Sequence, residues 1–180
     1  REPLQDYGGG FLTKKGAGTL YLDGTNTFTG PTTVTGGALG GGGILAGDVS
    51  VSIGAALAPG DAGTNTGTLT VGGNLTLEGN LWIKVNTSLA QSNDMVVVMG
   101  GPTNLGAGSV VASNVGPTLA VGDKFTLFSK PLVNGGTLTV SGGGATWANN
   151  LAVDGSISVV SVIPTVPPVA TGVSRLSDGN

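Results

Sequence analysis

The stretch of sequence that decides the fold runs from Leu12 to Leu39 and reads LTKKGAGTLYLDGTNTFTGPTTVTGGAL. Apolar residues alternate with threonine, and glycines interrupt this alternation every few residues. Alternation with a period of two predicts β-strands, because successive side chains of a strand point to opposite faces. The glycines supply corners that need a positive φ angle. The stretch therefore predicts short strands separated by tight turns.

The same pattern continues along most of the chain. Strand-sized segments recur every 8–12 residues. Similar five-residue motifs occur at residues 18–22 (GTLYL), 67–71 (GTLTV) and 136–140 (GTLTV). No window of twelve residues has the apolar spacing of an amphipathic helix. Regular short strands fit a sandwich or a solenoid, and the near-repetition favours the solenoid.

Composition narrows the class of protein further. The chain has 180 residues, of which 35 are glycine without a G-X-Y period, so a collagen-like structure is excluded. Only 4% of residues are aromatic, which predicts a thin core of aliphatic side chains. The net charge is −3 and the seven basic residues form no stripe, so nucleic acid is not expected as a partner. No apolar run approaches the roughly 20 residues that span a bilayer.

Three segments are predicted. Residues 1–10 match no pattern and form an N-terminal extension, and residues 11–162 form the β-solenoid. Residues 163–180 contain Pro164, Pro167 and Pro168 and form an extended tail or linker, because proline cannot donate to a β-ladder.

The opening stretch resembles the autotransporter-associated β-strand repeat, which occurs in passenger regions of bacterial surface proteins. The residues that carry the resemblance are Lys14, Gly16, Gly18, Thr19, Leu20, Leu22, Gly24, Asn26, Thr27, Phe28, Thr29, Gly30, Thr33, Val34, Gly37 and Leu39. Residues 54–81, 93–98, 122–128 and 146–157 are similar to segments that accompany such repeats. The resemblance implies an all-β fold, a right-handed parallel β-helix with extended N- and C-terminal segments. It also implies an extracellular or cell-surface location and carries no catalytic residues.

The residues themselves argue against an enzyme. The chain has no histidine and no cysteine, which removes the usual neutral-pH acid–base group, the usual zinc ligands and the usual nucleophile systems. Asp48, Asp61, Glu78 and Asp94 are spaced so that some could meet on neighbouring coils, as in β-helix lyases and hydrolases. No lysine or arginine is expected beside them to clamp a substrate. We therefore expect isolated solubilising acids, with no catalytic, cofactor or metal site.

Three other groups of residues have a functional and an ordinary interpretation. Asp123 and Asp154 lie in turns, but the calcium-binding nonapeptide pattern is not reproduced around them. Threonines at 25, 27 and 29, and at 64, 66, 68 and 70, could form a flat ladder for ice or polysaccharide, yet threonine is also a common strand former. Trp82 and Trp147 could stack on sugars, although packing over the core or a solenoid end is favoured.

The ends of a solenoid give the remaining hypothesis. An open terminal coil exposes unpaired backbone groups that invite strand addition. Residues 1–10 and 156–176 could either cap these ends or reach a neighbouring molecule. The sequence therefore favours a structural subunit or segment of an extracellular fibre, whose partner is another copy of itself in a head-to-tail oligomer or filament. A glycan or a cell surface is the other candidate partner. The alternative is a surface adhesin or glycan-binding module, and a β-helix polysaccharide lyase or hydrolase is a third class.

Overall fold

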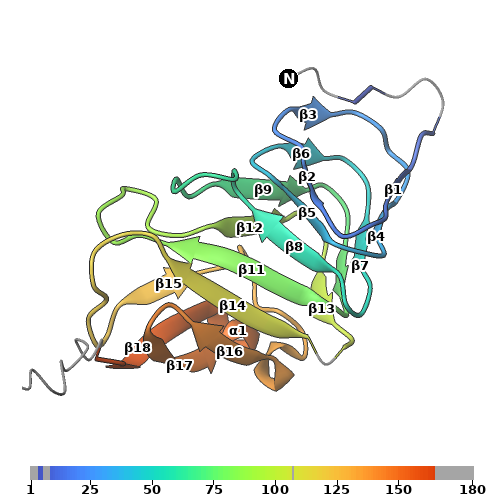
Figure 1. Cartoon of the computed structure of the whole chain (residues 1–180). Coiled ribbons are helices and arrows are strands. Elements are labelled where there is room, and N and C mark those ends of the chain that lie inside the picture. The colour runs from blue at the N-terminus through green and yellow to red at the C-terminus, as the bar shows by residue number, and fades with distance from the viewer. Residues whose placement is uncertain (1–3, 6–8, 107, 165–180) are drawn as a thin grey trace, which may run out of the picture.

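The computed structural model describes residues 4–5, 9–106 and 108–164. Successive coils of the chain stack into one elongated body whose strands form three parallel sheets. A small antiparallel sheet lies at the end away from the N-terminus (Figure 1). Between residues 12 and 114 the chain visits the three parallel sheets in turn, contributing one strand to each per coil. This arrangement confirms the predicted all-β parallel solenoid.

Each parallel sheet has an unbroken order of strands from successive coils. Sheet A consists of β1 (Leu12–Lys14), β4 (Thr32–Val34), β7 (Val49–Val51), β10 (Leu75–Leu77) and β13 (Pro102–Asn104). Sheet B consists of β2 (Thr19–Tyr21), β5 (Ala38–Gly41), β8 (Ala56–Pro59), β11 (Asn80–Val85), β14 (Ser109–Asn114) and β16 (Thr139–Gly142). Sheet C consists of β3 (Thr25–Asn26), β6 (Ile44–Leu45), β9 (Thr68–Val71) and β12 (Met95–Val98).

The core is a set of side-chain columns that run along the stack. Inward-facing residues of sheet B pair in register from coil to coil and form the column Leu20, Leu39, Leu57, Leu81, Val110 and Val140. Leu39, Leu57, Leu81 and Val110 are fully buried. In-register stacking brings like side chains into contact at the strand spacing of about 4.8 Å, so aliphatic residues fill the narrow interior without large rings.

One column of sheet A has polar residues at both of its ends. In sheet A the column Val34, Val51 and Leu77 is preceded by Lys14 and followed by Asn104. The Lys14 ammonium group is buried and donates to the carbonyl oxygens of Lys15 (3.0 Å), Gly16 (2.7 Å) and Gly36 (2.9 Å). A buried charge needs such partners. The lysine thereby closes the corner of the first coil.

One glycine shows why the corners require this residue type. Gly41 lies where sheet B turns towards sheet C and has a φ angle of 116°, which L side chains rarely adopt. A Cβ atom at this position would lie 2.1 Å from the carbonyl oxygen of Leu22 on the preceding coil. The corner therefore depends on both the backbone angle and the close approach of two coils.

The described part of the N-terminal segment lies against the first coil. The backbone nitrogen of Leu4 donates to Asn26 Oδ1 (2.9 Å), and the Leu4 carbonyl accepts from the Thr27 amide (3.1 Å). Further along, the Gly10 carbonyl accepts from the Gly30 amide (3.0 Å). Gly10 thus lies beside the corner that precedes β4, and Leu4 lies beside the end of β3 in sheet C.

The opposite end departs from a uniform stack. β15 (Lys124–Thr126), β17 (Ala145–Asn150) and β18 (Ser156–Val162) form an antiparallel sheet with β18 in the middle. The chain reverses between β16 and β17 because Gly142, Gly143 and Gly144 all have positive φ angles. A second reversal runs through the short helix α1 (Leu151–Asp154) and Gly155, and a 3-10 turn, η1 (Gly135–Thr137), precedes β16. We call this antiparallel sheet the cap.

One buried hydroxyl group gives a stability prediction. Thr32 is 1% exposed, and its Oγ1 atom finds no hydrogen-bond partner in the described part of the chain. Replacing Thr32 by valine removes the unpaired hydroxyl while keeping the shape, so we expect the free energy of unfolding to rise by about 1 kcal/mol. Urea denaturation measures this change. Thr33→Val, on the outward face of the same strand, should give no comparable gain, and a loss of stability in Thr32→Val would contradict the interpretation.

Candidate functional sites

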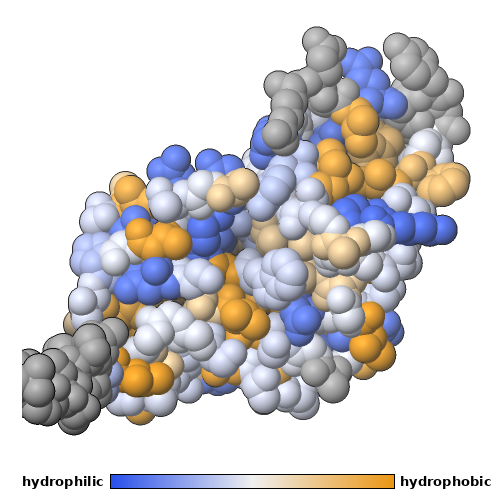
Figure 2. Space-filling view, in the orientation of Figure 1, coloured by the Kyte–Doolittle hydropathy of each residue, from blue (hydrophilic) through white to orange (hydrophobic). Residues whose placement is uncertain are grey.

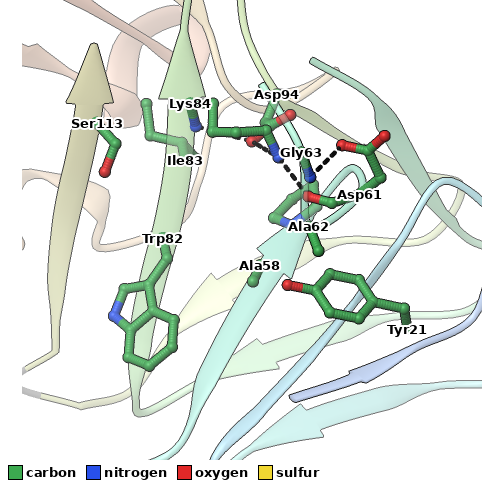
Figure 3. Close-up of a pocket in the computed structure, with 11 residues that line it drawn as sticks. Tyr21, Ala58, Asp61, Ala62, Gly63, Trp82, Ile83, Lys84, Asp94 and Ser113 are labelled. Atoms are coloured by element: carbon green, nitrogen blue, oxygen red, sulfur yellow. Dashed lines mark hydrogen bonds and ion pairs between the residues drawn. The ribbon is translucent and has the colours of Figure 1, made fainter. Parts of the chain in front are cut away.

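The outer face of sheet B carries a cleft between two aromatic side chains. The strand register places Tyr21 of β2 beside Gly40 of β5, and Gly40 beside Ala58 of β8. Trp82 follows on β11, because its neighbour Leu81 pairs with Leu57. Two small residues therefore lie between two large rings along one outward row, and Figure 3 shows Tyr21 and Trp82 on either side of Ala58.

The small side chain of Ala58 leaves space between the two rings. A Cβ atom at Gly40 would lie 3.0 Å from Cδ1 and Cε1 of Tyr21, so the tyrosine ring covers the glycine and packs against the sheet beside the cleft. Trp82 is 42% exposed. The cleft encloses about 480 Å³ of empty space, part of it open to solvent. The expectation that Trp82 packs over the core or an end is therefore wrong, because its position on β11 points outward from the sheet.

The polar rim of the cleft comes from Asp61, Lys84 and Asp94. The Lys84 ammonium group donates to the Asp61 carbonyl oxygen (2.8 Å) and lies 3.2 Å from Asp94 Oδ2. The expectation that no basic residue stands near these acids is wrong. Lys84 is ten residues from Asp94 in sequence, and the turn between β11 and β12 folds the two side chains together (Figure 3). Of the four acids singled out in the sequence, the structure brings Asp61 and Asp94 to one site.

Asp94 is a structural anchor of this rim. Its Oδ1 accepts from the Gly67 amide (2.8 Å) and its Oδ2 accepts from the Lys84 amide (2.7 Å). The side chain is 1% exposed. Burial raises the pKa of Asp94 above the ordinary value of 3.8, although both amides and the Lys84 charge act in the opposite direction. Both carboxylate oxygens are thus engaged in holding the loop that precedes β9 against β11.

The other two acids lie apart from this site. Asp48, just before β7, accepts through Oδ1 from the Asn74 amide (2.7 Å), which ties neighbouring coils together. Glu78 directly follows β10. Among the described residues, no three His, Cys, Asp or Glu side chains come close enough together to hold a metal ion.

Asp123 and Asp154 serve the cap. Asp123 accepts through Oδ2 from the Ala120 amide (2.8 Å), which closes a turn. Asp154 pairs with Lys124 at 2.7 Å on the surface, and the Lys124 hydrogen bond lowers the pKa of Asp154 below 3.8. Both aspartates thus have an ordinary local role as turn and surface groups.

The hydroxyl groups form a row that the sequence did not reveal. Thr13, Thr33, Ser50, Thr76 and Thr103 pair in register along the outer face of sheet A. Each of these residues is the central residue of a three-residue strand. In the sequence, the only signal for this row is a hydroxyl residue between two inward-facing residues. On sheet C, Thr25, Ile44, Thr70 and Val97 share one row, so the threonines at 25 and 70 belong to a mixed column.

Trp147 belongs to the cap, as predicted. Its ring packs edge-on against Phe125 with a centroid separation of 6.0 Å, and its Nε1 donates to the Gly142 carbonyl (3.0 Å). The indole thereby fastens β17 to the glycine turn that reverses the chain.

The two ends of the stack differ in what they present. β1 and β2 are the outermost strands of sheets A and B, so among the described residues they pair on one side only. At the other end, Phe125 of the cap and Phe128, which forms a parallel bridge to Val96 of β12, add buried rings to the core. The segment predicted to cap or to donate a strand begins with β18, which lies between β15 and β17 in the cap and pairs with both. Residues 165–176 of that segment lie outside the described residues.

Comparison with known proteins identifies the opening stretch. Residues 12–39 match the family model of the passenger-associated-transport-repeat, which agrees with the predicted autotransporter-associated repeat. The match covers β1 to β4 and the first two residues of β5, which is the first coil and part of the second. Neither the curated proteins nor the solved structures contain a significant match to this chain. The described part of the chain has no helix long and apolar enough to cross a membrane.

Proposed function

We propose that this chain, which carries a passenger-associated-transport-repeat, is a structural segment of an extracellular or surface-displayed β-solenoid, and that it associates through its N-terminal coil. The observation that carries the proposal is the polarity of the stack. Parallel strand edges are available at β1 and β2, whereas the last coil is followed by the antiparallel cap.

Backbone directions at β1 support strand addition there. The Leu12 amide donates to Pro31 and the Lys14 carbonyl accepts from Thr35, so both residues face β4. Alternate residues of a parallel strand direct their backbone groups to opposite sides. The amide and carbonyl of Thr13 therefore point away from β4, towards the open edge. Such an edge is a template for another strand.

The cap limits how copies of the chain can join. Two copies that pair through their N-terminal coils bury both open edges and form a closed pair related by a two-fold axis. A longer fibre needs a contact other than coil on coil at the capped end. In this proposal, coil-on-coil contact is therefore confined to the N-terminal end.

Thr13→Pro tests the association. Proline removes the outward-facing amide and is tolerated in an edge strand, so the variant should fold but lose strand addition. We expect sedimentation velocity to show concentration-dependent association of the natural chain and a monomer for Thr13→Pro. Thr13→Ser keeps the amide and should associate normally. A natural chain that stays monomeric at every concentration, or a Thr13→Pro variant that still associates, would refute association through this edge.

A further inference from the structure

We propose that the cleft between Tyr21 and Trp82 on sheet B is a binding site for a neutral saccharide. This inference is independent of strand addition at the N-terminal coil. It rests on three features of the cleft: two aromatic walls, a floor kept small, and a polar rim held in place by buried contacts.

The aromatic walls are built into the register of the sheet. Tyr21 and Trp82 come from strands β2 and β11, with β5 and β8 between them. At the same outward row β5 carries Gly40, which lies beneath the Tyr21 ring, and β8 carries Ala58, which forms the floor of the cleft. The C–H groups on the face of a sugar ring can therefore contact an aromatic face. The partial negative charge on that face attracts the partially positive hydrogens of the sugar.

The polar rim supplies hydrogen-bonding groups at one end of the cleft. Lys84 has three N–H donors, and two of its acceptors are Asp61 O and Asp94 Oδ2. Asp61 is exposed, and its Oδ1 accepts from the Gly63 amide (2.9 Å). Asp61 can therefore accept a hydrogen bond from a ligand hydroxyl group through Oδ2, while Lys84 can donate one. The buried carboxylate of Asp94 is fixed by hydrogen bonds from two backbone amides, and it therefore keeps Lys84 at this position.

The charge of the rim selects among ligands. Two carboxylates, Asp61 and Asp94, stand against one ammonium group, so an anionic sugar chain would meet net negative charge. The cleft is shallow and open to solvent, which is unsuited to a lipid chain. The outer face of sheet B seen in Figure 2 is also a mixture of apolar, intermediate and hydrophilic residues, without one large apolar patch. Amphipathic rings beside a few hydrogen-bonding groups match a neutral sugar.

Fluorescence titration tests the proposal. In a Trp147→Phe background Trp82 is the remaining tryptophan, so its emission reports on the cleft. The probes are cellohexaose, maltohexaose and chitohexaose, with hexagalacturonate as the anionic comparison. We expect at least one neutral probe to change the emission saturably and hexagalacturonate to bind more weakly.

Two variants, assayed by calorimetry, separate the cleft from the rest of the surface. Trp82→Ala removes a wall, and Ala58→Leu fills the floor without touching the buried columns. Each should weaken binding by at least about tenfold, which corresponds to roughly 1.4 kcal/mol. Thr70→Leu makes a matched change on the outer face of sheet C and should leave affinity unchanged. The proposal is overturned if no neutral probe binds, if hexagalacturonate binds best, or if folded Trp82→Ala and Ala58→Leu bind like the natural chain.

Discussion

Replacing Leu57 by alanine is expected to lower the free energy of unfolding by about 2–5 kcal/mol. Leu57 is fully buried in the third position of the sheet B column, between Leu39 and Leu81. The substitution removes one methine and two methyl carbons and leaves a void, because strands fixed by a backbone ladder at about 4.8 Å cannot close in along the stack. Urea denaturation followed by circular dichroism measures the loss.

Ile53→Ala is the matched control for this cavity. Ile53 is 77% exposed at a corner between sheets A and B, so its truncation should change stability by no more than about 0.5 kcal/mol. Each coil contacts only its neighbours, and a defect in the middle of the stack can uncouple the two halves. Tryptophan fluorescence should therefore be followed alongside circular dichroism. Equal effects of Leu57→Ala and Ile53→Ala would show that the column does not support the stack.

The column of Leu57 is the part of the fold that the sequence predicts best. Alternation in residues 12–39 identifies which side chains face inward, because one face of each strand must be buried. Pairing partners are harder to predict. Leu12 pairs with Thr32 and Thr32 with Val49, 20 and 17 residues on, whereas Val49 pairs with Leu75 and Leu75 with Pro102, 26 and 27 residues on. A variable coil length hides the register.

For the same reason the sequence indicates single residues of the candidate site, such as Trp82 and Asp94, but not that they lie together. Tyr21, Ala58 and Trp82 meet only because of the register across β2, β5, β8 and β11, and nothing in the separate segments indicates it. The Lys84–Asp94 pair depends on the loop at residues 86–94, which adds length to its coil. The antiparallel cap likewise follows from three consecutive glycines, 142–144, whose positive φ angles cannot be distinguished in sequence from the other glycine corners.

Replacing Asp94 by alanine is expected to cost about 3–5 kcal/mol, the range for removing one partner of a buried ion pair. The substitution removes the acceptor of two backbone amides, those of Gly67 and Lys84. It also removes the counter-charge of the Lys84 ammonium group, whose side chain is 15% exposed and which, among the described residues, keeps only the Asp61 carbonyl oxygen as a partner. Because the two amides belong to different coils, the loop before β9 should detach from β11. Urea denaturation at neutral pH measures the loss, and amide hydrogen exchange at Gly67 should accelerate.

Lys124→Met provides the comparison with an exposed pair. Lys124 and Asp154 are 2.7 Å apart, but their side chains are 54% and 42% exposed. Water and salt screen such a pair. The variant should therefore keep the stability of the natural chain within experimental error. If Lys124→Met is as destabilising as Asp94→Ala, burial is not what makes the Asp94 contacts important.

The pH dependence of stability shows which of two effects on Asp94 is larger: the cost of burying its carboxylate or the attraction of that carboxylate to Lys84. Burial raises the pKa of Asp94 above 3.8, so the native chain binds this proton more readily than the unfolded chain. Stability attributable to this group should therefore increase as the pH falls through the raised native pKa, and level off below 3.8. Asp94→Asn cannot titrate at this position and keeps one acceptor oxygen. The difference in unfolding free energy, natural chain minus Asp94→Asn, should grow on acidification. A difference that shrinks instead would mean that attraction to Lys84 outweighs the cost of burying the carboxylate.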